Sequence, residues 1–417
     1  MERKRVVITG LGTINALGHT VDDYWNGLIS GTSGVRPISG FDPSDLPCKI
    51  GGEVLDFNPL DYMERKAARR ASRSTQFAVA ASRQALEDAD LNYPMENPER
   101  VGVMIGTAVA GVDHILDGNQ VFLNKGYSRM KPYQVPSGIP NIPAFQVARE
   151  FQCLGPNNTT TTACAAGTQA VGEGAELIRR GAADVVISAG AEAIVTPLVV
   201  GTFSVMRALP FNYNDHPEKA SRPFTIDREG FVLSEGSAAL ILESLDHALD
   251  RGARIYAEVI GHSSSSDGYD IVAMRPDGSG AIRAMLWALQ DAGVDITDVD
   301  YINAHGTSTP LNDKTETLAI KTLFGEEAYN IPVSSTKSMM GHAMGASGAL
   351  EAIACTLAIY KDTIPPTINY DNPDPECDLF YVPNEALDTK VNIALSNSFG
   401  LGGQNACLLL KSYNGRP

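Results

Sequence analysis

The stretch QALEDADLN at residues 84–92 recurs half a chain later as WALQDAGVD at residues 287–295. Each copy closes a segment whose apolar residues follow the 3.6-residue period of an amphipathic helix. The residues that define these two periods are Phe77, Ala80, Ala81, Gln84 and Ala85 in the first segment, and Ile282, Met285, Leu286 and Leu289 in the second. A repeat of this kind predicts that the chain contains one structural unit twice.

The elements around the repeat also occur in pairs and in the same order. Each half is expected to contain an opening strand, a strand after the repeated helix, a polar strand-like run that leads through a small-residue turn into a helix, and a closing β-hairpin. In the first half these are residues 5–9, 101–106, 158–163, the helix from Cys164 to about 180, and 231–243; in the second they are residues 255–260, 299–305, 332–336, 346–361 and 391–410.

Strands that alternate with helices, twice over, predict an α/β fold of two packed halves with mixed sheets. The halves are expected to span residues 1–252 and 253–417. An insert at about 111–150 contains many prolines and no clear period, so we expect a cap or an interface there. A second insert is expected near residues 205–229.

Composition excludes several classes of protein. The net charge of the 417 residues is −16, which argues against a general nucleic-acid binder because phosphate binding requires a basic surface. No apolar run reaches the roughly 18–20 residues of a membrane span. The N-terminus lacks the pattern of a signal peptide, so a cytoplasmic protein is expected. The six cysteines form no CxxC pair, and the histidines show no zinc-site spacing.

Cys164 is the candidate nucleophile. It lies in TTTTACAAG (159–167), after a strand-like run and before a helix rich in small residues. A helix N-terminus stabilises a thiolate, which is the reactive form of cysteine. The alternative is an inert core cysteine, and this is the interpretation we adopt for the other five.

Two histidines occupy turns that match the turn of Cys164. His305 follows an apolar strand in YINAHGTSTP (301–310), and His342 lies in KSMMGHAMGASG (337–348), the duplicated counterpart of the cysteine turn. If the halves pack as a duplication, Cys164 and His342 approach each other and His305 lies beside them. A lone histidine is more often structural, but two in such positions favour catalysis.

A glycine-rich turn is a third candidate for the site. Residues 400–403 read GLGG, and three glycines in four positions can leave backbone N–H groups free to form an oxyanion hole. A plain hairpin turn is the alternative.

Four segments together carry a resemblance to a known family. TTACAAGTQA (161–170), NAHGTSTPLNDKTE (303–316), STKSMMGHAMGASGALE (335–351) and NSFGLGGQN (397–405), in this order, resemble the β-ketoacyl-acyl carrier protein synthases of the thiolase superfamily. The likeness is strongest to the type II elongating enzymes of fatty acid synthesis, and it extends from Val6 to Leu410. It implies a five-layer αβαβα fold and a homodimer.

The resemblance also implies a decarboxylative Claisen condensation. Cys164 would take an acyl group from acyl carrier protein, and His305 and His342 would act in the decarboxylation of malonyl-acyl carrier protein. Lys337 matches a lysine that orders the site electrostatically. The backbone N–H groups of Cys164 and Leu401 match an oxyanion hole. No metal or redox cofactor is implied.

Substrate contacts follow from the same resemblance. Thr307 and Thr309 match residues that hold the phosphopantetheine arm, and Val109 matches the far end of the acyl pocket. Phe399 keeps its family identity. The chain departs from the family at Leu401, a gate position that is usually phenylalanine, and in the loop DGYDIV (267–272), where Asp270 and Val272 replace histidine and threonine. These departures affect substrate choice more than chemistry.

A basic patch on an acidic chain indicates a partner. Arg65, Lys66, Arg69, Arg70 and Arg73 lie close together on a segment with helical spacing. Because acyl carrier proteins are acidic, docking through Lys66, Arg69 and Arg70, with Arg207, is expected; a solvated charged face is the alternative.

Three other functions remain open at this stage. A polyketide or other specialised-pathway ketosynthase would fit the departures at Leu401 and Asp270. A silent partner subunit would typically lack the nucleophile, which this chain retains. A degradative thiolase would use a second cysteine where this chain has histidines.

Overall fold

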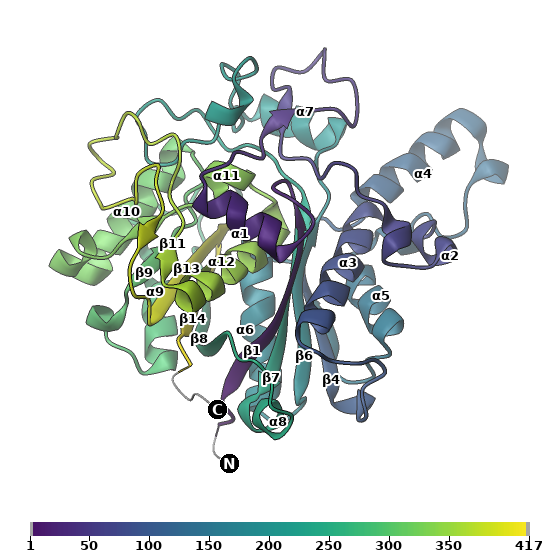
Figure 1. The fold of residues 1–417 in the computed structure, drawn as a ribbon. Coiled ribbons are helices and arrows are strands. Elements are labelled where there is room, and N and C mark those ends of the chain that lie inside the picture. Colours follow the sequence, from purple (N-terminus) through teal and green to yellow (C-terminus); the bar gives the residue numbers. More distant parts are fainter. Residues whose placement is uncertain (1–2, 414–417) are drawn as a thin grey trace.

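The computed structural model describes residues 3–413 and contains one large mixed sheet among them (Figure 1). Its ten strands run in the order β10-β9-β13-β14-β8-β1-β7-β6-β4-β5 within this part of the chain. The strands of the first half are β1 (Val6–Asn15), β4 (Val101–Gly106), β5 (Asn157–Thr160), β6 (Val185–Glu192) and β7 (Gly236–Ser244). Those of the second half are β8 (Ala257–Ser266), β9 (Tyr301–Asn303), β10 (Val333–Ser334), β13 (Ile393–Gly400) and β14 (Gln404–Lys411).

The strand order confirms the duplication. Read outward from the centre, β1-β7-β6-β4-β5 and β8-β14-β13-β9-β10 have the same sequence of antiparallel, antiparallel, parallel and parallel pairings. The two halves of the sheet meet where Val7 and Ile8 of β1 pair with Glu258 and Ala257 of β8.

Helices cover both outer faces of the sheet halves and fill the space between them (Figure 1). The helices are α1 (Val21–Ile29), α2 (Arg65–Ala68), α3 (Arg73–Asp88), α4 (Val112–Lys125), α5 (Ile142–Phe151), α6 (Ala166–Arg179), α7 (Pro197–Val205), α8 (Leu245–Asp250), α9 (Ser279–Ala292), α10 (Pro310–Phe324), α11 (Lys337–Met340) and α12 (Ser347–Lys361). The repeated helices α3 and α9 pack on the outer faces, and α6 and α12 contact each other and both halves. The result is the expected five-layer αβαβα arrangement.

Small residues allow α6 and α12 to cross closely in the central layer. A Cβ on Gly167 would lie 2.7 Å from the backbone nitrogen of Ala349, and a Cβ on Gly348 would lie 2.4 Å from that of Thr168. Because these neighbours are backbone atoms that cannot move aside, only glycine fits at the crossing. This crossing brings the N-terminal turns of α6 and α12 together.

Two local predictions were wrong. Residues 231–243 do not form a hairpin, because β7 is a single strand between β1 and β6. The true counterpart of the β13–β14 hairpin is the antiparallel pair β6–β7, whose connection is opened by an insertion. The 111–150 insert, in which the sequence shows no clear period, contains the helix α4 and much of the helix α5. Only Gly118 of α4 is buried, so this helix has no apolar stripe facing the core that would reveal its period.

Other boundaries shifted by a few residues. β1 and β8 continue to Asn15 and Ser266, beyond the predicted ends, whereas β9 is shorter than residues 299–305. Between residues 3 and 413, no helix combines the length and the apolar character that a bilayer span requires.

Candidate active site

Cys164 lies in a short turn that joins β5 to α6. Residues Ala163–Ala165 form a 3-10 turn, and Ala163 adopts a left-handed backbone conformation with φ of 48°. The thiol is buried, and its sulfur lies 3.7 Å from the Sδ atom of Met344. The nucleophile candidate thus lies at the N-terminal end of the central helix, at the bottom of a pocket.

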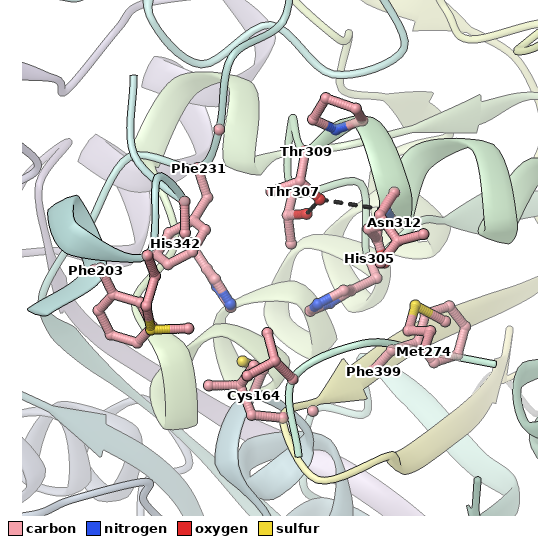
Figure 2. Close-up of a pocket in the computed structure, with 18 of the residues that line it drawn as sticks. Cys164, Phe203, Phe231, Met274, His305, Thr307, Thr309, Asn312, His342 and Phe399 are labelled. Atoms are coloured by element: carbon pink, nitrogen blue, oxygen red, sulfur yellow. Dashed lines mark hydrogen bonds between the residues drawn. The ribbon is translucent and has the colours of Figure 1, made fainter. Parts of the chain in front are cut away.

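His305 and His342 approach Cys164 from the second half of the chain (Figure 2). A ring nitrogen of each histidine and the Sγ atom of Cys164 all lie within 4.8 Å of one another. The two rings are nearly perpendicular, with centroids 5.3 Å apart. The structure therefore brings together the three side chains that the sequence singled out.

The two histidines are held differently: the ring of His342 by a hydrogen bond, and His305 through its backbone and an aromatic contact, since its Nδ1 has no hydrogen-bond partner among the described residues. Nδ1 of His342 is hydrogen-bonded to Oγ of Ser347 at 2.9 Å, which leaves Nε2 facing the pocket. The backbone N–H groups of His305 and Gly306 donate to the two carboxylate oxygens of Glu316, each at 2.8 Å. The ring of Phe399 packs edge-on against His305, with centroids 5.6 Å apart.

Burial determines the protonation states of the site. Burial, together with the positive charge of Lys337, holds the pKa of His305 and of His342 well below the ordinary value, so both rings are neutral at pH 7. Burial raises the pKa of Cys164 to about 11, although the backbone N–H of Leu401 and the N–H of Cys164 itself oppose this rise. Burial therefore outweighs the stabilisation of the thiolate that the sequence predicts from the helix N-terminus.

The two opposing N–H groups are those expected for an oxyanion hole. Both N–H groups lower the pKa of the thiol, and β13 and β14 pack against the cysteine turn. A Cβ on Gly400 would lie 2.6 Å from the carbonyl oxygen of Thr162, so this approach requires glycine.

Lys337 does not point into the pocket and instead forms a buried ion pair. Its ammonium contacts the carboxylate of Glu351 on α12, and the two side chains are 1% and 0% exposed. Burial raises the pKa of Glu351 to about 7. Lys337 thus acts on the histidines through its charge and not through contact with a substrate.

A pocket of about 330 Å³ opens above the cysteine and the histidines. Thr307, Thr309 and Leu401 line it, as does Arg207. The hydroxyls of Thr307 and Thr309 are hydrogen-bonded to each other at 3.0 Å, and Thr309 also caps α10 (Figure 2).

Two expected substrate residues lie outside this pocket. Val109 is not among the lining residues and is 40% exposed. Asp270 is exposed and accepts hydrogen bonds from the N–H groups of Val272 and Ala273, so it shapes its own loop. Val272, and not Asp270, reaches the pocket.

The predicted basic patch loses Arg73 and keeps its other members, because Arg65 is exposed at the same surface hollow as the three residues proposed for docking. Lys66, Arg69 and Arg70 are exposed around a separate surface hollow, to which Lys131 also contributes. Arg73 does not belong to this free surface, because its guanidinium is paired with the buried Glu235 at 2.7 Å.

Sequence reasoning missed the buried carboxylates that hold the site. Glu316 and Glu351 are two of them, and Glu192 is a third. Glu192 accepts hydrogen bonds from the N–H groups of residues 108–110 and from that of Gly345, at 2.6–3.2 Å, and so ties a turn of the first half to one of the second. The available signal was a set of acidic residues inside otherwise apolar elements, such as Glu192 at the end of β6.

Comparisons with known proteins agree with this geometry. The family described as "Beta-ketoacyl synthase, N-terminal domain" matches residues 3–248, and "Beta-ketoacyl synthase, C-terminal domain" matches residues 256–371. The 3-oxoacyl-[acyl-carrier-protein] synthase 2 of Synechocystis sp. is 51% identical over 413 residues, which cover 99% of both chains.

Solved structures of ketosynthases have the same fold. The ishigamide ketosynthase/chain length factor superposes with a TM-score of 0.92 at 39% identity, over 99% of this chain and 100% of the other. A type II polyketide acyl-carrier protein in complex with its ketosynthase gives 0.91 at 36% identity, with the same coverage. The fold and the matched domains place the chain among the acyltransferases that condense acyl groups. It belongs to the β-ketoacyl synthase family, as the resemblance in its motifs implied.

Proposed function

We propose that this protein is a 3-oxoacyl-acyl carrier protein synthase that elongates acyl chains in fatty acid synthesis. The observation that carries the proposal is the convergence of one thiol and two neutral imidazoles, within 4.8 Å, in a pocket that opens to the surface. The full-length likeness to 3-oxoacyl-[acyl-carrier-protein] synthase 2 supports this substrate class.

In the first step, Sγ of Cys164 attacks the thioester carbonyl of acyl-acyl carrier protein. A neutral imidazole takes the thiol proton, and the N–H groups of Cys164 and Leu401 stabilise the oxyanion. The C–S bond to phosphopantetheine then breaks, and its sulfur leaves with the proton. The acyl group is now a thioester of Cys164.

In the second step, malonyl-acyl carrier protein loses carbon dioxide. The electron pair of the broken C–C bond forms an enolate, whose oxygen accepts hydrogen bonds from His305 and His342. The hydrogen bond between Ser347 and Nδ1 of His342 is compatible with the tautomer that carries its proton on Nε2, and in that tautomer Nε2 is the donor to the enolate. The enolate carbon attacks the acyl thioester, the bond to Cys164 breaks, and 3-oxoacyl-acyl carrier protein forms. The departing thiolate of Cys164 takes up one proton from the solvent, which restores the thiol.

Acyl carrier protein is proposed to dock on Lys66, Arg69 and Arg70, with Arg207 beside the pocket. Charge reversal at Lys66 and Arg69 should raise KM for carrier-bound substrate and leave kcat nearly unchanged. The reason is that charges at the rim of an interface mainly change the rate at which the two proteins associate. The matched control is Lys361→Glu, an exposed lysine in the last turn of α12. An unchanged KM in the doubly reversed variant would contradict this docking site.

A homodimer is part of the proposal, because one edge of the sheet is open. At the β10 edge, Val333 donates its N–H to the carbonyl of Phe380. At the β5 edge, the N–H of Thr159 reaches only the neighbouring side chain of Asn158. Apolar Leu154, exposed just before β5, adds to this surface. Uncovered edge strands favour pairing with another chain.

The reaction is proposed to take place in the cytoplasm. All six cysteines are free thiols, as expected for a reducing compartment.

The decisive test is intact-mass analysis after mixing the protein with a panel of acyl-acyl carrier proteins. We expect a mass increase of one acyl group in the unaltered protein and none in the Cys164→Ala variant. An adduct that persists in that variant would exclude Cys164 as the nucleophile.

A specialised-pathway ketosynthase is the second candidate, favoured by Leu401 in the pocket wall and by the likeness to polyketide ketosynthases. The same acyl panel separates the two functions. A housekeeping elongase should accept a series of saturated acyl groups, whereas a specialised enzyme should react with one unusual primer. A silent partner subunit would form no adduct with any of them.

A further inference from the structure

Four side chains with metal-ligating atoms meet at the bottom of the pocket. Met344 places its thioether sulfur 3.7 Å from the sulfur of Cys164, and the two imidazoles lie within 4.8 Å of that thiol and of each other. In the part of the chain that the structure describes, Cys164, His305 and His342 are the one group of three or more such residues that could hold a metal ion. We call the set of four the soft-ligand cluster: Cys164, Met344, His305 and His342.

The distances in this cluster are close to those of a metal site. Metal–sulfur and metal–nitrogen bonds of about 2.0–2.3 Å place the ligand atoms of one ion roughly 3.3–3.8 Å apart. The distance between the sulfurs of Cys164 and Met344 already falls in this range. The remaining ligand atoms would have to move inward by about 1 Å, which rotation of buried side chains can supply.

The kind of ligand selects the kind of cation. The cluster offers two sulfurs and two imidazole nitrogens, and none of its four members is a carboxylate. Thiolate and thioether ligands prefer copper(I), whereas magnesium, calcium and manganese prefer oxygen. Two histidines, a cysteine and a weakly bound methionine form the ligand set of a known class of copper protein. The thioether of Met344 is the feature that distinguishes copper(I) from zinc.

The surroundings also suit a bound ion. Nδ1 of His342 is hydrogen-bonded to Ser347, so its ring is oriented from behind, as the ligands of metal sites usually are. The ring of Phe231 packs edge-on against His342, and that of Phe399 against His305. An ion in this position would be largely shielded from water.

We propose that the pocket binds one copper(I) ion through the soft-ligand cluster and that the bound ion blocks acylation. On binding, Cys164 gives its proton to the solvent, a Cu–S bond forms, and copper remains copper(I), so no oxidant is needed. The Cu–S bond lowers the nucleophilicity of the sulfur, and the ion occupies the space through which a thioester would approach. An acyl group on Cys164 excludes copper for the same reason, so the two compete for one atom.

The test measures transfer of copper(I) to the full chain from a chromophoric chelator of known affinity, without oxygen. We expect one equivalent of copper(I) per unaltered chain and none for Cys164→Ala. Loss of a supporting group at a metal site lowers metal affinity by at least about 10-fold. Met344→Leu should therefore weaken copper(I) affinity by at least this factor and change zinc affinity by less than about 3-fold. Met274→Leu, the same substitution in the same pocket, should leave copper(I) affinity unchanged.

A second measurement uses the unaltered protein and so does not require that the variants fold correctly. Copper(I) should protect Cys164 of the unaltered protein from iodoacetamide, and excess chelator should restore alkylation. Absence of a stoichiometric copper(I) complex, retention of it by Cys164→Ala, or equal affinity in Met344→Leu would each overturn the inference. None of these measurements uses a carrier protein, so a protein that binds copper(I) but forms no acyl adduct would refute only the proposed function.

Discussion

The buried ion pair of Lys337 and Glu351 permits a quantitative prediction. Both side chains are almost wholly excluded from solvent, and their charges compensate each other. Glu351→Leu would leave the ammonium of Lys337 without a counter-ion in the core. Removing one partner of such a pair costs about 3–5 kcal/mol, a large fraction of the about 5–15 kcal/mol that stabilises a typical protein.

Lys337→Met should be less harmful at low pH than at high pH. In the unaltered protein burial raises the pKa of Glu351 to about 7, above its ordinary value of 4.5, and removal of Lys337, which lowers this pKa, raises it further. A raised carboxyl pKa favours the folded state at low pH, and that contribution is lost as the pH rises from 4.5 through the raised pKa. The variant should therefore be destabilised less at pH 5.5 than at pH 8, because its carboxyl can bind a proton.

The pair is tested by a double-mutant cycle with urea-induced unfolding at constant protein concentration. Replacing both partners with Lys337→Met and Glu351→Leu should recover most of the loss, because no charge remains buried. Lys361→Met, an exposed change near the end of α12, should alter the free energy of unfolding by less than about 0.5 kcal/mol. If the losses of the two single variants simply add in the double variant, the ion pair does not hold this part of the core.

Three further outcomes follow from the structure. Because the pKa of Cys164 is raised to about 11, its alkylation by iodoacetamide should accelerate about tenfold per pH unit between pH 7 and 9; a plateau below pH 8 would indicate a resting thiolate. Gly167→Ala places a Cβ 2.7 Å from the backbone nitrogen of Ala349 and should cost roughly 1–3 kcal/mol, seen as a lower Tm, whereas Gly201→Ala meets only an ordinary contact at 3.6 Å and should not lower it. Thr159→Pro removes an outward N–H from β5 and should shift the sedimentation of the protein toward a monomer; an unchanged dimer would exclude this edge as the interface.

Much of the fold could be predicted because the duplication repeats its signals. β4 and α12 are nearly continuous apolar runs that are buried throughout, and α3 buries one face, so the sequences of all three indicate elements of the core. The first-half hairpin was misplaced because an insertion separates β6 from β7, and pairing across such an insertion leaves no local turn signal. The helix α4 was missed because only one of its residues, Gly118, is buried.

The site could be predicted only as far as its motifs extend. Cys164, His305 and His342 lie at turns between strands and helices, where glycine and small residues mark them. The carboxylates of Glu192 and Glu316 bind backbone N–H groups, and such partners leave no trace in residue type. The burial that opposes ionisation of Cys164 depends on the whole tertiary structure, so the sequence does not reveal it.

Burial accounts for both unusual features of this site. A helix N-terminus stabilises an anion by about 0.3–1 kcal/mol, up to ~2 in favourable geometry. The rise in the pKa of Cys164 from 9.0 to about 11 corresponds to roughly 3 kcal/mol, so loss of solvation outweighs the helix. The same loss, with the charge of Lys337, holds the pKa of both imidazoles below the ordinary value. The thiol therefore needs a base, and burial supplies one by keeping the imidazoles unprotonated. In the condensation step those neutral rings donate hydrogen bonds to the enolate. Burial thus prepares the pocket both for acyl transfer to Cys164 and for the condensation that follows.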